Sequence, residues 1–376
     1  MISHRIQVPG AGADMNRNSP KEFAIILNQN AHRVTQGLLR SAQRAAPRVA
    51  LYTSRTKEEG YQIIKEVLDR GYRRIICGGG DGTLVHVLSE TKKYLEEKNA
   101  RLHEMGHHAR EGLSRLSLPE LGILKLGTGN SLAPILGSKG GLKPLLRLAQ
   151  GEEFKTQRIN LIESEDRCFT FCGLGWDAQI LNDYVWLKEQ CRPRLLSRIF
   201  RNLLGYLTAI AFRTIPKVLL ARKHVVATAR NLGRQVYRVR SNGDLEPIRC
   251  EPGEIFYTGP CHVIGAATTP YYGYRLKAFP DAMKMPGYMQ VRVIKAGVGE
   301  LLSHMPTIWQ GTYKSPNFVD FLVENVHFAF SETMPLQIGG DAEGYRKELA
   351  LEVSETTVDF LDFGSPVSEA QPPPTA

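Results

Sequence analysis

Short apolar runs alternate with helical patterns in the first third of the chain. The apolar runs stand at residues 22–28, 48–53, 72–78 and 121–126. Between the second and third runs, residues 57–69 have the period of an amphipathic helix, whose apolar face is formed by Tyr61, Ile63, Ile64, Val67 and Leu68. A second helix is expected to begin after Thr83. Because strands joined by crossover helices build parallel sheets, this pattern predicts an α/β, doubly wound domain.

The pattern changes near Lys155, where β-rich runs separated by Gly, Asn or Pro take over. Two such runs, residues 348–353 and 357–363, predict the last two strands. We therefore expect a first domain over residues 21–155 and a second, mainly antiparallel domain over residues 156–364. Residues 1–20 and 365–376 have no apolar period and are expected to be disordered.

The composition is that of a globular protein, with 42% hydrophobic residues among 376. Six cysteines stand singly or within apolar runs, without paired CxxC spacing, and no secretory leader or spanning apolar segment is present. These features predict a cytoplasmic protein with reduced thiols. The formal charge of +10 calls for an anionic partner, and charge alone leaves nucleic acid, phosphorylated ligands and anionic membranes as candidates.

A glycine-rich loop, Gly78-Gly79-Gly80-Asp81-Gly82-Thr83, stands between the third predicted strand and the second helix. Glycines at such a junction let backbone N–H groups face a polyphosphate, and the helix N-terminus adds the positive end of its dipole. Asp81 is out of place beside an anion unless it binds Mg²⁺ or accepts a proton. The alternative is a tight strand-to-helix turn in which Asp81 caps the helix.

A second loop, Gly127-Thr128-Gly129-Asn130-Ser131, follows the next predicted strand and precedes an expected helical segment over residues 132–137. Turns at the carboxyl ends of strands in a doubly wound sheet face one crevice, where such sheets bind ligands. One nucleotide is therefore expected to touch both loops. Asn28, at the end of the first strand, is placed to meet the same crevice.

The order of motifs resembles that of the diacylglycerol kinase catalytic-domain family, which includes bacterial lipid kinases, sphingosine kinases and ceramide kinases. These motifs, over roughly residues 22–363, are LNQN, GGGDGT, LGTGNSLAPILG, GLGWDA, YYGYRLKAFPDA and GGDAEG. The resemblance implies an ATP-binding α/β domain packed against a β-sandwich domain that admits a lipid. The resemblance does not imply nucleic acid as a partner.

The resemblance also implies roles for the loop residues in binding ATP. The phosphates would lie at Gly79, Gly80, Gly82 and Thr83, and the rest of the nucleotide at Asn28, Gly127, Thr128 and Asn130. Asp81 becomes the first choice for a general base or a carboxylate linked to Mg²⁺.

Three further carboxylates gain roles from the same resemblance. Asp341 and Glu343 match the family's late DGE motif, with Ala342 in place of its glycine, and would close the active site, Asp341 sharing Mg²⁺ with Asp81. Asp177 matches a position that contacts the lipid head group in sphingosine kinases. The alternatives are a surface hairpin turn for the GGDAEG segment and a helix cap for Asp177.

Two departures from the family pattern bear on metal and substrate. Asp281 is followed by residues 282–287, AMKMPG, where many bacterial relatives have an Asp-Asp-Gly that holds an auxiliary Mg²⁺, so we expect this auxiliary site to be absent. Ser131 replaces an Asp that often follows GTGN, which favours sphingosine or ceramide kinases slightly.

Residues 192–224 interleave eight Lys or Arg with Leu, Ile, Phe and Tyr. Such a segment suits interfacial helices on an anionic membrane, although a solvated basic helix packed on its own core is the alternative. The sequence thus predicts a peripheral ATP-dependent lipid kinase acting on a diacylglycerol-like or ceramide- or sphingoid-like hydroxyl. A soluble NAD-kinase-like enzyme and a non-catalytic lipid-binding regulator remain the rival functions.

Overall fold

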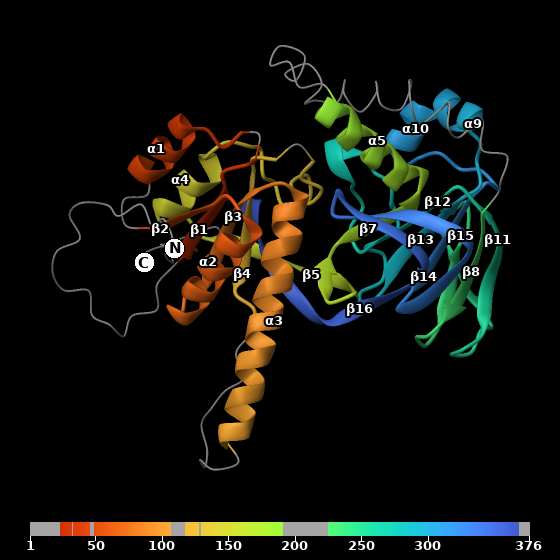
Figure 1. Ribbon diagram of the computed structural model, residues 1–376, viewed down its shortest axis with the longest axis horizontal. Helices are drawn as coiled ribbons and strands as arrows, with labels where there is room; N and C mark the ends of the chain where they lie inside the picture. Colours follow the sequence, from red (N-terminus) through yellow and green to blue (C-terminus); the bar gives the residue numbers. More distant parts are fainter. Residues whose placement is uncertain are drawn as a thin grey trace, which may run out of the picture. The chain divides into compact units, whose positions relative to one another are not determined.

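The computed structural model describes residues 23–31, 33–45, 49–106, 117–127, 129–190 and 225–367 (Figure 1). The chain forms two compact units. The first runs to Ile159 and resumes at Val358, and the second comprises Asn160–Thr357. The sequence-based boundary at residues 155 and 156 thus lies a few residues from the division, while the last strand, assigned above to the second domain, belongs partly to the first unit.

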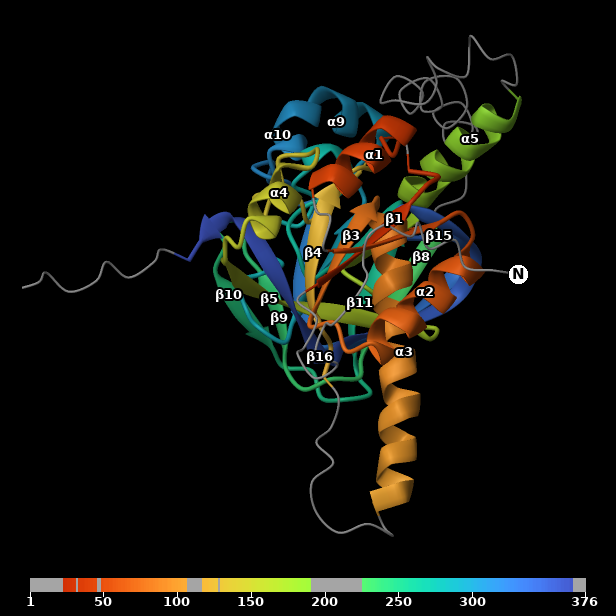
Figure 2. The same cartoon turned by 90° about the vertical axis from the view of Figure 1, so that its left-hand side faces the viewer.

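The first unit is built on a parallel sheet with the strand order β2-β1-β3-β4-β16, of which β4, β3 and β1 lie side by side in Figure 2. The strands are β1 (Phe23–Asn28), β2 (Ala50–Ser54), β3 (Arg74–Gly79), β4 (Glu120–Lys125) and the end of β16 (Asp341–Pro366). Ile25 is in register with both Leu51 and Ile76, so three apolar residues stand in one row across the sheet. The predicted parallel sheet is confirmed.

Helices cover both faces of this sheet, because its strands bury side chains on both sides. On one face Ile25 and Leu27 pack in a core with α1 (Gln36–Ala45) and α4 (Lys143–Ala149). On the other face α2 (Lys57–Asp69) packs against β2, and α3 (Asp81–Gly106) against β3 and α2. Doubly wound topology follows from this arrangement.

The helix α2 begins and ends where the apolar period predicts. Thr56 caps its first turn by accepting from the Glu59 N–H at 3.1 Å, and the Glu59 carboxylate reaches back to the Arg55 N–H at 2.7 Å. Ile63, Ile64 and Val67 form its buried face, whereas Tyr61 and Leu68 are only partly buried.

The helix expected over residues 132–137 is wrong, since these residues form hydrogen-bonded turns. The Leu136 N–H does bond to the Leu132 carbonyl at 3.0 Å, as in a helical turn. Gly137 then adopts a left-handed φ of 59°, which ends the turn after one cycle.

The second unit is antiparallel, as the sequence predicts. One ladder has the order β10-β9-β14-β13-β12-β7-β15, and β15 also pairs with β8, which pairs with β11. Besides the first half of β16 and the end of β5 (Phe154–Ser164), whose start lies in the first unit, the strands are β6 (Arg167–Phe169), β7 (Phe171–Gly175), β8 (Val225–Asn231), β9 (Val236–Val239), β10 (Leu245–Ile248), β11 (Ile255–Cys261), β12 (Val263–Ala267), β13 (Met289–Ile294), β14 (Phe318–Val323) and β15 (Asn325–Ile338). The described part of this unit also contains the helices α5 (Trp176–Gln190), α9 (Val298–Ser303) and α10 (Met305–Trp309) and a short 3-10 helix (Gly273–Arg275).

The strand β16 is one strand where the sequence predicts two. Its first half pairs with β15 as far as Glu352, and Phe360 then pairs with Leu121 of β4. No turn interrupts it, because the chain stays extended while its pairing partner changes.

Candidate active site

The two predicted glycine loops lie against each other in the first unit. An ideal Cβ on Gly127 would stand 2.2 Å from the Gly80 Cα and 2.8 Å from the Gly79 carbonyl oxygen. No side chain fits such a gap, so Gly127 is required by the contact between the loops. The sequence placed both loops at one crevice, and the structure brings them into van der Waals contact.

Asp81 joins the loops by hydrogen bonds. It is the first residue of α3, and its Oδ1 accepts from the Ser131 N–H at 2.7 Å and from the Ser131 hydroxyl at 2.8 Å. A carboxylate in the first turn of a helix is also stabilised by the helix dipole. Ser131, which the sequence marks only as a departure from the family pattern, is therefore the residue that fixes the predicted catalytic carboxylate.

The predicted nucleotide residues Asn28 and Thr83 also meet. The Asn28 amide donates to the Thr83 hydroxyl at 2.9 Å, and its Oδ1 accepts from the Asn30 N–H at 2.9 Å. These bonds connect the end of β1 to the first turn of α3, where Gly82 also lies. The three predicted elements of the nucleotide site are thus contiguous.

Asn130 has a left-handed φ of 58° and is buried, with 4% of its surface exposed. Its Nδ2 donates to the Gly127 carbonyl at 2.7 Å, while its Oδ1 has no hydrogen-bond partner among the described residues. A buried acceptor without a donor is costly unless a ligand supplies one. Thr128, the remaining predicted contact, lies outside the described residues.

These loops fit a nucleotide. The glycines place no side chain at the N-terminus of α3, and Asn130 offers an acceptor suited to an amine or hydroxyl donor. Within the described ranges no group of three or more His, Cys, Asp or Glu side chains is placed to hold a metal ion by itself.

Asp177, the predicted lipid contact, stands at the start of α5 in the second unit, directly after β7. Its Oδ2 accepts from the Gln337 amide at 3.0 Å and lies 3.3 Å from the Tyr272 hydroxyl, which also lies 2.8 Å from the Cys172 carbonyl. An ideal Cβ on Gly173 would stand 1.8 Å from this Oδ2, so a glycine in β7 makes room for the carboxylate. The side chain is engaged with β15 and the loop after β12, unlike a simple helix cap.

Burial raises the pKa of Asp177 to about 6, and the hydrogen bonds from Gln337 and Tyr272 partly oppose this rise. The same burial and the neighbouring carboxylate raise the pKa of the Tyr272 phenol well above its ordinary value, so this phenol stays protonated as a donor. The carboxylate is therefore ionised for the most part at neutral pH.

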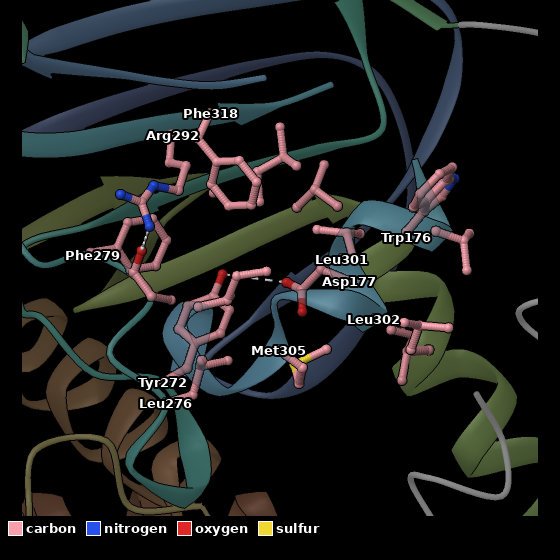
Figure 3. Close-up of a pocket in the computed structure, with 17 residues that line it drawn as sticks. Trp176, Asp177, Tyr272, Leu276, Phe279, Arg292, Leu301, Leu302, Met305 and Phe318 are labelled. Carbon is pink, nitrogen blue, oxygen red and sulfur yellow. Dashed lines mark hydrogen bonds between the residues drawn. The ribbon is translucent and has the colours of Figure 1, made fainter. Parts of the chain in front are cut away.

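A cavity of about 220 Å³ opens beside Asp177 (Figure 3). Its wall is almost wholly apolar. The apolar lining residues include Ile294 of β13, Leu301 and Leu302 of α9, Met305 and Ile308 of α10, and Phe318 of β14. Arg292 also lines it, but its guanidinium makes a two-point ion pair with Asp320 at 2.7 and 2.8 Å. Among the described lining residues, Asp177 is thus the charged group left available to a ligand.

The predicted catalytic pair Asp341 and Glu343 follows a tight turn in which Gly339 and Gly340 have φ values of 56° and 82°. Asp341 opens β16 and is exposed, and the Glu343 carboxylate is ion-paired with Arg167. The alternative suggested by the sequence, a surface hairpin turn, describes this backbone geometry correctly. A shared role of Asp341 and Asp81 in holding Mg²⁺ stays a prediction.

Two residues of the site were given no role from the sequence. Tyr272 stands inside a motif quoted above for the family, and Gln337 stands four residues before Asp341. Neither has a local spacing that points to Asp177. The basic segment 192–224 lies outside the described residues, and no helix in the described part of the chain is long and apolar enough to cross a membrane.

The fold is that of a two-unit α/β protein in which two glycine loops meet at the ends of parallel strands, and comparison with known proteins shows what the chain is similar to. Residues 22–162 match the model of the diacylglycerol kinase catalytic domain. A protein named "Probable lipid kinase YegS-like", from Enterobacter sp. (strain 638), is 26% identical over 267 residues, which are 70% of each chain. Residues 22–162 are thus similar to the diacylglycerol kinase catalytic domain, and the chain is similar to a probable lipid kinase.

Solved structures agree on the fold. A crystal structure of a diacylglycerol kinase from Bacillus anthracis str. Sterne matches with a TM-score of 0.54 and 11% identity, over 91% of this chain and 97% of that one. Two further solved structures, each of a putative diacylglycerol kinase from the same organism, match over the same shares, with TM-scores of 0.57 and 0.55. At such low identity these likenesses concern the fold alone.

Proposed function

We propose that this chain transfers the γ-phosphoryl group of ATP to a hydroxyl of a membrane lipid whose polar head meets Asp177. The observation that carries the proposal is the Asp177 carboxylate at one side of a cavity whose wall is otherwise almost wholly apolar. Such a cavity buries hydrocarbon by the hydrophobic effect and orients one polar group, the usual design of a site for an amphipathic ligand.

The charged residues that line the cavity restrict which lipid head groups can bind there. Because Asp320 neutralises Arg292, the cavity offers a phosphate no free cation among its described residues, and Asp177 would repel one. A hydroxyl or a protonated amine can instead donate to the carboxylate. This favours a diacylglycerol-like or a ceramide- or sphingoid-like lipid over one with an anionic head group.

Asn28, Thr83, Asn130 and the glycines of the two loops would hold the nucleotide. When bound, Mg·ATP supplies the phosphoryl group and the cation that offsets its charge. Asp81, fixed by its two bonds from Ser131, is our candidate to accept the hydroxyl proton or to hold Mg²⁺, and Asp341 and Glu343 are our candidates for the further catalytic carboxylates. Access to a lipid also calls for docking at the membrane, which we assign to the basic segment 192–224.

The test is phosphoryl transfer from radiolabelled ATP to diacylglycerol, ceramide and sphingosine in mixed micelles, with wild type and Asp177→Asn. We expect transfer to at least one of these lipids and a loss of about tenfold or more in kcat/KM for Asp177→Asn, since a hydrogen bond to a charged group is lost. The KM for ATP should not change.

Asp166→Asn is the matched control, because Asp166 is exposed in the same unit and its φ of 62° suits Asn equally well. Full activity of Asp177→Asn would contradict the assigned site. ATP binding without transfer to any lipid would favour a regulatory protein, and transfer to NAD instead would favour the soluble kinase.

A further inference from the structure

Gln337 is a buried polar residue, 3% exposed, at the end of β15. It is in register with Gly173 of β7 on one side and with Ala342 of β16 on the other. Both neighbouring strands carry site residues, since β7 leads directly into Asp177 and β16 begins with Asp341. Its side chain therefore stands between the proposed head-group carboxylate and the proposed catalytic hairpin.

The oxygen and the nitrogen of the Gln337 amide make hydrogen bonds to two different parts of the site. Its Oε1 accepts from the Gly340 N–H at 2.8 Å, and its Nε2 donates to Asp177 Oδ2 at 3.0 Å. A backbone N–H can only donate, and an ionised carboxylate can only accept. The amide orientation is thus fixed by both partners, and rotating it by half a turn would break both bonds.

Gly340 lies in the turn that sets the direction of Asp341. Both residues of this turn have positive φ, and the Gly339 N–H bonds to the Phe171 carbonyl at 3.1 Å. The Gln337 bond is a side-chain tie to the second of these glycines. A shift of the Gln337 amide therefore moves a turn whose next residue is Asp341.

We propose that Gln337 is a positioning residue that couples the lipid head group at Asp177 to the hairpin carrying Asp341. Occupation of Asp177 by a hydroxyl holds the Gln337 amide in place, and this amide holds the turn for phosphoryl transfer. The inference rests on the proposed function, because it takes the ligand of Asp177 to be the lipid substrate.

Two variants test these bonds. Gln337→Met keeps the length of the side chain and removes both bonds, together with the 3.3 Å bond from Nε2 to the Tyr272 hydroxyl. Gln337→Glu keeps an acceptor for Gly340 and loses the Nε2 donor. We expect each variant to lower kcat for lipid phosphorylation by about tenfold. The KM for ATP should stay unchanged, and Gln62→Met, an exposed change on α2, should behave as wild type.

Amide hydrogen exchange at residues 339–343 distinguishes this coupling from a purely structural role of Gln337, because a structural role predicts no effect of lipid on the exchange rate. Addition of a short-chain diacylglycerol or ceramide should slow this exchange in the wild type and leave it unchanged in Gln337→Met and Gln337→Glu. If lipid slows exchange equally in all three proteins, or if both variants lose thermal stability while kcat is retained, the coupling is refuted. If the wild type phosphorylates no lipid, the proposed function itself fails, so the two failures are distinguishable.

Discussion

Gly127 illustrates how one missing side chain shapes the nucleotide site. Its Cα faces the backbone of Gly80 so closely that an added Cβ would stand 2.2 Å from a main-chain atom, which cannot rotate away. Gly127→Ala must therefore separate the two loops, and with them Asp81 from Ser131. We expect Gly127→Ala to lose most nucleotide affinity and to destabilise the fold by about 1 to 3 kcal/mol.

Binding of a fluorescent ATP analogue and thermal unfolding would measure these two effects. Gly299→Ala is the matched control, because nothing lies within 4 Å of its added Cβ and the residue stands in α9. Retention of wild-type nucleotide affinity by Gly127→Ala would show that the loops need not touch in the binding state.

Asp177 gives the protein a pH-dependent stability. Burial raises its pKa from 3.8 to about 6, so the folded state binds the proton more tightly than the unfolded state. Stability is then lost as the pH rises from about 4 to about 6. Asp177→Asn cannot ionise, and its free energy of unfolding should exceed that of wild type by an amount that grows across this window to at most about 3 kcal/mol.

Chemical denaturation of both proteins at several pH values would check this dependence. Because the Asp177 carboxylate also borders a cavity, we expect the difference in unfolding free energy between the two proteins to stay well below that upper limit. A difference that stays constant between pH 4 and pH 7 would mean that Asp177 titrates like an exposed carboxylate.

At the scale of single residues the sequence predicts the loops and Asp81, because glycines and an acid at a strand-to-helix junction form a local pattern. It does not predict the partners of Asp177. Tyr272 and Gln337 lie 95 and 160 positions away from it along the chain, and only the pairing of β7, β12 and β15 brings them together.

In the first unit, one arginine forms ion pairs that connect the start of β3 to β4 and to the residue before β5. Arg74 at the start of β3 bonds to Glu120 of β4 at 2.6 Å and to Glu153, next to β5, at 2.7 Å. The bonds from Glu153 and Glu120 raise the pKa of Arg74 further, so it stays charged. We expect Arg74→Ala to lower the free energy of unfolding by about 1 to 2 kcal/mol, since two ion pairs are lost from a largely covered side chain.

Arg158→Ala provides the comparison, because Arg158 also bonds to a carboxylate, that of Asp359, but with 70% of its side chain exposed. Water replaces such a bond at little cost, so Arg158→Ala should unfold like wild type. Equal losses in the two variants would argue that coverage of the ion pair does not matter here.

The elements show where periodicity succeeds and where it does not. α2 is predicted to the residue because its apolar face and its Thr56 cap are both local. The turns at residues 132–137 are not predicted, because the left-handed conformation of Gly137 ends the first helical turn. The continuity of β16 is not predicted either, because it depends on a change of pairing partner from β15 to β4. Strand continuity depends on distant partners, which no window of sequence contains.

For the molecule as a whole, the basic segment 192–224 carries the prediction of membrane docking. It has eight Lys or Arg among apolar residues, each worth about 1 kcal/mol near an anionic surface. Charge reversal in Arg198→Glu with Arg201→Glu should therefore weaken binding to phosphatidylserine vesicles by more than tenfold. Sedimentation with vesicles measures the bound fraction of each protein directly.

The control for this charge reversal is Lys93→Glu with Arg101→Glu, which changes the net charge equally on exposed positions of α3. If both double variants bind vesicles alike, net charge and not the segment drives docking. If the first variant binds like wild type, the segment is an ordinary solvated element.

In the proposed reaction this chain phosphorylates a lipid hydroxyl with ATP bound at the two glycine loops. The most direct measurement incubates wild type and Asp81→Asn with radiolabelled Mg·ATP and a total lipid extract, beside NAD as a soluble acceptor, and identifies the labelled product by mass spectrometry. We predict a phosphorylated neutral or amino lipid that Asp81→Asn forms at least about a hundredfold more slowly. Label in NAD alone, or full activity of Asp81→Asn, would contradict the account.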